Sequence, residues 1–285
     1  MKVRVPASSA NLGPGYDTLG LALSLYLTVE VREADSLSVI ARGEGAGLPV
    51  DENHLAVSVA KSVAGHSNLA ISIDSEIPLA RGLGSSAALA VAVAAAAGAY
   101  DAFVVASDVD GHCENAGASY LGGLVAGARA EDGWEVVSLP IDPRISAVVI
   151  IPEAELPTKE ARAAVPKAIP TEDAVFNLQR LAMLMAGLAD LDRLNPAWGM
   201  DRIHEPAREQ VFPLARTLKE LLLDGGARIA TWSGAGSSVI GIFERDEAHE
   251  RAEATGVQLS AAGIAARALP LEVDREGLVV LDDAQ

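Results

Sequence analysis

Short alternations of apolar and polar residues predict β-strands in the first third of the chain. β-Branched and aromatic residues mix with polar ones at period two in residues 3–5, 25–31, 37–40 and 70–73. A glycine-rich stretch, residues 43–49, leads into a helix that we expect to begin near Asp51 and Glu52, because acidic residues favour a first helical turn. Residues 87–100 are mostly alanine and predict a buried helix that is too short and too weakly apolar to span a membrane.

The second half of the sequence continues the mixture of helices and strands. Helical periodicity predicts helices over residues 175–191, 210–223 and 246–254. Strands are predicted over residues 147–151, 228–232 and 239–243, with one more near the end. The two kinds of element interleave without a repeat of 20–50 residues, so we predict an α+β fold. The new strand after residue 144 places a domain boundary between residues 145 and 146.

Composition limits the classes of partner and compartment. Half of the 285 residues are apolar, which is enough for one large or two medium domains. The formal charge of −17 argues against binding nucleic acid or an anionic membrane, so an anionic ligand must be held locally. Cys113 is the single cysteine and cannot form an intramolecular disulfide. With no secretory h-region near Met1, we expect a cytoplasmic protein.

The sequence Gly-Leu-Gly-Ser-Ser at residues 82–86 lies between a predicted strand and the alanine-rich helix. Glycines allow close approach of a ligand, and a helix N-terminus attracts anions, so this loop is a candidate phosphate cradle. A tight strand-to-helix turn is the simpler interpretation of such a loop by itself. No lysine follows the last glycine and a third glycine is missing, which excludes a Walker loop and a dinucleotide fingerprint.

Three motifs together resemble the GHMP kinases, the superfamily of galactokinase, homoserine kinase, mevalonate kinase and phosphomevalonate kinase. They occupy residues 6–17, 78–88 and 233–238. The first motif, Pro-Ala-Ser-Ser-Ala-Asn followed by glycine, an aromatic residue and Asp, is most similar to the homoserine kinase branch. Further matches to that branch lie at residues 51–53, 111–115, 121–123, 158–162, 173–177 and 202–208.

The resemblance implies a two-domain GHMP kinase fold. Residues 1–145 would form an N-terminal nucleotide-binding α+β domain, and residues 146–285 a C-terminal ferredoxin-like α+β domain. The implied activity is ATP-dependent phosphorylation of the L-homoserine hydroxyl to O-phospho-L-homoserine in threonine biosynthesis, with Mg²⁺ and in a homodimer.

Homoserine is a zwitterion with a terminal hydroxyl, so its pocket needs a carboxylate, guanidinium groups and neutral polar groups. The resemblance implies that Asn115, His112 and Arg162 act in catalysis. It assigns substrate binding to Asn11, Asp17, His112, Arg162, Arg208 and Gly234. Taken singly, these residues have simpler roles: Asn11 as a turn former, Asp17 as a helix cap, His112 as a core histidine and the arginines as surface charges.

The resemblance also assigns residues to the nucleotide and the metal ion. The nucleotide would contact Asn53, Pro78, Arg81, Gly82, Leu83, Gly84, Ser85, Ser86 and Ala87, with adenine near Asn53. Mg²⁺ would be held by Ser86 and Asp110, and phosphoryl transfer requires mainly such charge cancellation and positioning.

The chain departs from the family at the metal site. Residues 110–115 read Asp-Gly-His-Cys-Glu-Asn where the family usually has Glu-Gly-His-x-Asp-Asn, so the Asp110 side chain is one methylene shorter. Either a water bridges the gap, because Mg²⁺ retains several waters, or the shorter side chain weakens the metal site. Two alternatives stay open: a GHMP kinase acting on another small alcohol, and a non-catalytic binding or regulatory protein.

Overall fold

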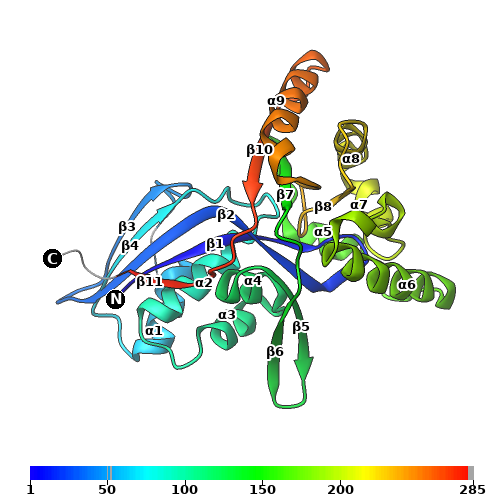
Figure 1. Ribbon diagram of the computed structural model, residues 1–285. Coiled ribbons are helices and arrows are strands. Elements are labelled where there is room, and N and C mark those ends of the chain that lie inside the picture. Colours follow the sequence, from blue (N-terminus) through cyan, green and yellow to red (C-terminus); the bar gives the residue numbers. More distant parts are fainter. Residues whose placement is uncertain (50, 52, 282–285) are drawn as a thin grey trace.

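The computed structural model describes residues 1–49, 51 and 53–281, which form two β-sheets with separate sets of helices (Figure 1). Helices α1 to α4 pack on the first sheet, α8 and α9 pack on the second, and α5 to α7 belong to the same half of the molecule as the second sheet. No described helix combines the length and the apolar character needed to cross a bilayer.

The first sheet contains seven strands, with order β11-β1-β2-β4-β3 and with β5 and β6 extending from β2. The strands are β1 (Lys2–Asn11), β2 (Gly15–Glu33), β3 (Ser38–Gly43), β4 (Leu69–Ser75), β5 (Leu124–Ala130), β6 (Gly133–Leu139) and β11 (Val279–Leu281). All four strands predicted in this region are confirmed, but β1 and β2 are much longer than the alternating pattern indicated. The end of β1 is buried throughout, and a continuously buried strand loses the period-two signal. The first motif therefore lies largely in a strand.

Four helices support the first sheet: α1 (Leu55–Ala64), α2 (Ser85–Ala96), α3 (Ala102–Asp110) and α4 (Glu114–Leu121). The alanine-rich helix α2 is buried on most sides, because alanine lets neighbouring backbones approach closely. The helix expected near Asp51 begins at Leu55; Glu52 lies outside the described residues.

The second sheet has the strand order β10-β7-β9-β8 and is antiparallel throughout. Its strands are β7 (Ile145–Pro152), β8 (Ile229–Trp232), β9 (Val239–Glu244) and β10 (Ala266–Glu272). Numbered within this domain, the order is 4-1-3-2, with helices after the first and third strands, which is the ferredoxin-like arrangement. The expected architecture of the C-terminal domain is thus confirmed.

The helices of the second domain are α5 (Thr158–Ala164), α6 (Thr171–Leu188), α7 (Glu205–Val211), α8 (Leu214–Asp224) and α9 (Arg245–Ala261), with short 3-10 turns at Leu191–Arg193 and Pro196–Gly199. The helix predicted over residues 210–223 is confirmed as α8 from Leu214 onward, but its first residues belong to α7. The chain breaks it at Phe212 and Pro213, because proline has no N–H to continue the helical hydrogen bonds.

The C-terminal strand returns to the first sheet. Strand β11 pairs antiparallel with β1, aligning Val280 with Val3. The end of the chain therefore stabilises the first sheet, although it follows the second domain in sequence. The boundary between residues 145 and 146 stays a prediction.

Candidate active site

The glycine loop between β4 and α2 packs directly against the other two motifs. Gly82 and Gly84 have φ values of +70° and +67°, a region that favours glycine. A Cβ on Gly82 would collide with the Ser233 carbonyl oxygen, and one on Gly84 with Ser8 Oγ. Ser233 Oγ donates a 2.7 Å hydrogen bond to the Gly82 carbonyl oxygen. The absence of side chains thus allows three distant segments to meet.

The start of helix α2 faces a cavity of about 510 Å³. Residues 82–87 line it, and Gly84 supplies no side-chain cap to the helix. The first N–H groups of a helix have no partner within it, and the helix dipole places partial positive charge there. The loop and helix start therefore have the geometry expected of a phosphate cradle.

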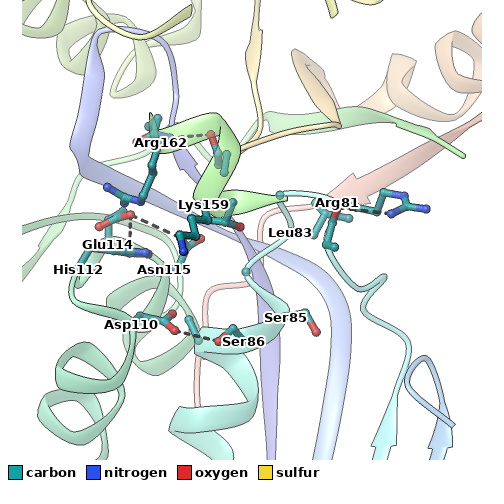
Figure 2. A pocket seen from close by; sticks show the side chains of 18 of the residues that line it. Arg81, Leu83, Ser85, Ser86, Asp110, His112, Glu114, Asn115, Lys159 and Arg162 are labelled. Atoms are coloured by element: carbon teal, nitrogen blue, oxygen red, sulfur yellow. Dashed lines mark hydrogen bonds and ion pairs between the residues drawn. The ribbon is translucent and has the colours of Figure 1, made fainter. Parts of the chain in front are cut away.

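Ser86 and Asp110 meet at the edge of this cradle, as Figure 2 shows. Ser86 Oγ donates a 2.8 Å hydrogen bond to Asp110 Oδ1. Burial raises the pKa of Asp110, while the Ser86 hydrogen bond opposes this effect. Asp110 closes helix α3, whose start is capped by Asp101 accepting from the Val104 N–H. The shorter carboxylate thus still reaches the serine.

These two oxygens fit a magnesium ion that is shared with a bound nucleotide. Mg²⁺ prefers one or two protein carboxylate or hydroxyl ligands, completed by substrate phosphates and water. No group of three or more His, Cys, Asp or Glu side chains in the described residues is placed to hold a metal. Phosphates and water would therefore complete a site formed by Ser86 and Asp110.

His112, Glu114 and Asn115 form a second polar group at the start of helix α4 (Figure 2). His112 Nδ1 lies 3.0 Å from Glu114 Oε1. Burial lowers the pKa of His112, but the Glu114 carboxylate outweighs burial and the net pKa is raised. Asn115 Oδ1 accepts a 2.9 Å hydrogen bond from Ser8 Oγ. The first motif thereby fixes the orientation of the Asn115 amide.

Arg162 on helix α5 pairs with Asp17 across the two domains. Its Nη2 and Nη1 donate hydrogen bonds of 2.8 Å and 3.1 Å to the two Asp17 carboxylate oxygens. Asp17 has φ +50°, and its N–H donates to Asn11 Oδ1. Arg162 lines the cavity, whereas Asp17 does not and lies just behind the guanidinium. The structure therefore brings together a carboxylate and a guanidinium predicted for one zwitterion.

Arg208 is the second arginine of the cavity wall and is only 1% exposed. Its Nη1 donates to the Gly234 carbonyl oxygen at 2.9 Å and lies 3.0 Å from His204 Nδ1. His204 Nε2 lies 2.9 Å from the Gly13 carbonyl oxygen. One tautomer satisfies both contacts: Nε2–H donates to Gly13, and Nδ1 accepts from Arg208. Burial lowers the pKa of His204, in agreement with a neutral ring.

Most residues predicted for the site line this one cavity. They are Asn11, Pro78, Arg81, Gly82, Leu83, Gly84, Ser85, Ser86, Ala87, Asp110, His112, Asn115, Arg162, Arg208 and Gly234. Asn53 does not line it and is exposed at the surface before α1. The roles given to all these residues stay predictions.

Arg81 lines the cavity, but its guanidinium serves the second domain. It donates to the carbonyl oxygens of Pro152 and Glu153 at 2.9 Å and 2.8 Å and lies 3.0 Å from Glu155 Oε1. Arg81 therefore anchors the glycine loop to the end of β7.

The cavity wall also contains Thr158, Lys159 and Glu114, to which the sequence motifs gave no role. Thr158 and Lys159 belong to the matched segment 158–162. Residues three or four apart share one face of a helix, so Arg162 implied that both would face the same side. The spacing of Thr158 and Lys159 from Arg162 was therefore the signal in the sequence that these two residues line the cavity.

Comparison with known proteins identifies the class and then the family. The chain matches the GHMP kinases N terminal domain over residues 54–123 and the GHMP kinases C terminal domain over residues 177–257. It is therefore a GHMP kinase by family and by fold. Homoserine kinases of Desulfitobacterium hafniense and Solibacter usitatus are 34% and 39% identical to it, aligned over 99% and 85% of this chain and 100% and 85% of theirs. The chain belongs to the homoserine kinase family.

A solved structure agrees with this family. The crystal structure of homoserine kinase from Cytophaga hutchinsonii matches with a TM-score of 0.84 and 27% identity, covering 99% of this chain and 97% of that one. The expected two-domain fold is confirmed.

Proposed function

We propose that this protein transfers the γ-phosphoryl group of ATP to the hydroxyl of L-homoserine, producing O-phospho-L-homoserine for threonine biosynthesis. One observation carries the proposal. A single cavity has the glycine loop and the Ser86–Asp110 pair in one wall, and Arg162 and Arg208 in another. The family membership and this arrangement support the same reaction.

The part of the cavity lined by the glycine loop, Ser86 and Asp110 would bind the nucleotide. It would act by positioning the phosphates and cancelling their charge. The N–H groups at the start of α2 would hold the phosphates, and Ser86 with Asp110 would hold Mg²⁺. The metal ion supplies positive charge next to the phosphates, which lowers the cost of the developing charge. The glycine loop would fix the position of the γ-phosphoryl group relative to the acceptor hydroxyl.

The part of the site near Arg162, Arg208 and Asp17, which we call the acceptor end, would recognise a zwitterionic amino acid. Its ammonium group would pair with Asp17, and its carboxylate with Arg162 and Arg208. Homoserine would then replace both sides of the existing Asp17–Arg162 ion pair. His112 and Asn115 lie between this end and the glycine loop, where they would orient the hydroxyl oxygen. In the transfer, the new bond joins that oxygen to phosphorus, the bond from phosphorus to the ADP oxygen breaks, and the hydroxyl proton is released to water.

The test is ADP release from ATP by the purified protein. Acceptors would be L-homoserine, L-serine, L-threonine, mevalonate and none, each with Mg²⁺ and with excess chelator. We expect turnover with homoserine that exceeds every other acceptor and requires Mg²⁺. Turnover with mevalonate or another alcohol would instead favour a different acceptor. A folded sample that binds ATP but turns over no acceptor would favour a non-catalytic protein.

We further propose that the protein is a cytoplasmic homodimer. The resemblance to homoserine kinases supports this assignment. Light scattering coupled to size-exclusion chromatography would give twice the chain mass. The chain mass itself would contradict the homodimer.

A further inference from the structure

Four formally cationic side chains lie in the described wall of the cavity: Arg81, Lys159, Arg162 and Arg208. The three arginines are already engaged. Arg81 holds the carbonyl groups at the end of β7, Arg162 holds Asp17 in two hydrogen bonds, and Arg208 is buried against Gly234. Within the described part of the chain, Lys159 alone among the four makes neither a hydrogen bond nor an ion pair.

Lys159 is positioned opposite the glycine loop. It lies in the first turn of helix α5, one turn before Arg162, so the two side chains share a face of the helix. Figure 2 shows Lys159 extending from α5 over the cavity, between Arg162 and Leu83. Its side chain is exposed, so the ammonium group can move toward a ligand without losing a protein contact.

Among the lysine and arginine side chains of the described wall, Lys159 is the one that can reach a ligand without first breaking a protein contact. The wall contributes the carboxylates of Asp110 and Glu114, while ATP brings several negative charges of its own. The backbone of the glycine loop and the start of α2 offers N–H groups and the partial charge of a helix dipole, but no full positive charge. A phosphoryl group in transfer is stabilised by cations that touch its oxygens, and a lysine serves this purpose as a point charge.

We propose that Lys159 is a catalytic residue whose ammonium group contacts the γ-phosphate of bound ATP. This inference rests on the proposed function, because it takes ATP as the phosphoryl donor. The contact would join α5 of the second domain to the nucleotide held by the first. It would be lost with ADP, which has no γ-phosphate.

The experiment compares equilibrium binding of ADP and of the non-hydrolysable analogue AMP-PNP, both with Mg²⁺, by calorimetry. Variants are Lys159→Ala, Lys159→Arg and the control Lys167→Ala. Lys167 is an exposed lysine just beyond α5 that does not line the cavity. We expect Lys159→Ala to weaken AMP-PNP binding about tenfold and ADP binding less than about twofold. Lys159→Arg should retain part of the preference for AMP-PNP over ADP. Lys167→Ala should change neither affinity.

Steady-state rates in the same samples distinguish the γ-phosphate contact of Lys159 from the proposed phosphorylation of homoserine. We expect Lys159→Ala to lower kcat with homoserine by roughly tenfold to a hundredfold. Equal weakening of ADP and AMP-PNP, or no weakening of either, would overturn the role of Lys159. If the wild-type protein does not phosphorylate homoserine but still shows the Lys159-dependent preference for AMP-PNP, the proposed acceptor fails and the lysine contact stands.

Discussion

At the scale of single residues, the Asp17–Arg162 pair is the clearest link between structure and substrate. Two short hydrogen bonds join side chains that are 145 positions apart. Both groups are partly exposed, with side-chain exposures of 37% and 33%, so the pair can exchange partners with a small ion. A zwitterion of the right length would satisfy both groups again, and a neutral alcohol would not.

Replacing Asp17 with Asn removes the negative charge and keeps the shape. We expect the KM for homoserine to rise at least about tenfold, because the substrate ammonium loses its partner. Nucleotide affinity should stay within about twofold, since the hydrogen-bond partners of Asp17 are Arg162 and Asn11 rather than residues of the glycine loop. Steady-state kinetics with both substrates varied measures this. Asp74→Asn, an exposed carboxylate on β4, is the control, and equal losses for both substrates would contradict a substrate role.

His204 illustrates how a buried neutral histidine makes stability depend on pH. Burial holds its pKa below the ordinary value of 6.5, so in the unfolded chain the ring takes up a proton at a higher pH. The unfolded state then binds more protons, and the free energy of unfolding falls as pH drops below about 6.5. Protonation would also remove the Nδ1 acceptor that faces Arg208.

Urea unfolding between pH 5.5 and 8 tests this linkage. The wild-type protein should lose stability steadily below about pH 6.5. His204→Gln should be less stable at pH 8, by about 1–2 kcal/mol, but should lose less as the pH falls. Exposed His249→Gln serves as the control. Parallel curves for wild type and His204→Gln would show that His204 does not contribute to the pH dependence.

At the scale of elements, the glycine loop depends on close packing as well as on its backbone conformation. A side chain at Gly84 would meet both Ser8 Oγ and Asn115 Oδ1. Ser8 and Asn115 are themselves hydrogen-bonded. Any shift of the loop would therefore displace the asparagine that we assign to the acceptor hydroxyl.

Gly84→Ala should lower the free energy of unfolding by about 1–3 kcal/mol and weaken nucleotide binding more than tenfold, because the loop must move away from β1. Gly98→Ala is a matched control. Gly98 also has a positive φ, of +91°, but an added Cβ there meets no atom within 4 Å among the described residues. Gly98→Ala should therefore show the conformational cost alone, with unchanged nucleotide affinity. Calorimetry and thermal unfolding distinguish the two, and equal effects would contradict the packing argument.

At the scale of the whole molecule, the chain crosses between its sheets more than once. Residues 1–139 build most of the first sheet, residues 145–272 build the second, and Val279–Leu281 returns to pair with β1. Asp274 assists this return by accepting hydrogen bonds from the N–H groups of Glu276 and Gly277. The stability of the first sheet thus depends on the end of the chain.

Deleting residues 279–285 should lower the free energy of unfolding by about 1–3 kcal/mol, the value of a few backbone hydrogen bonds, relative to deleting residues 282–285 alone. The shorter deletion is the matched control because it leaves β11 intact. Urea unfolding monitored by circular dichroism measures the difference. Identical stabilities would show that the β1–β11 pairing contributes nothing.

The sequence by itself determined most of the helices and strands and the types of side chain available to the site. Period-two and helical patterns located most strands and helices, because these patterns depend only on neighbouring residues. It failed where local signals were absent or misread: the buried end of β1 has no alternation, and Pro213 divides a helix that periodicity alone would continue. The three motifs also carried the glycines, the serines and the arginines of the site.

Only the tertiary structure decided which of these groups meet. Ser86 contacts Asp110, Arg162 contacts Asp17, and the guanidinium of Arg81 contacts the end of β7 although Arg81 lines the cavity. It also placed Lys159 in the cavity wall and left Asn53 outside it. The physical reason is that contacts between distant segments depend on strand order and on the packing of one domain against another. Those features arise from the burial of the whole core, which no short segment of sequence specifies.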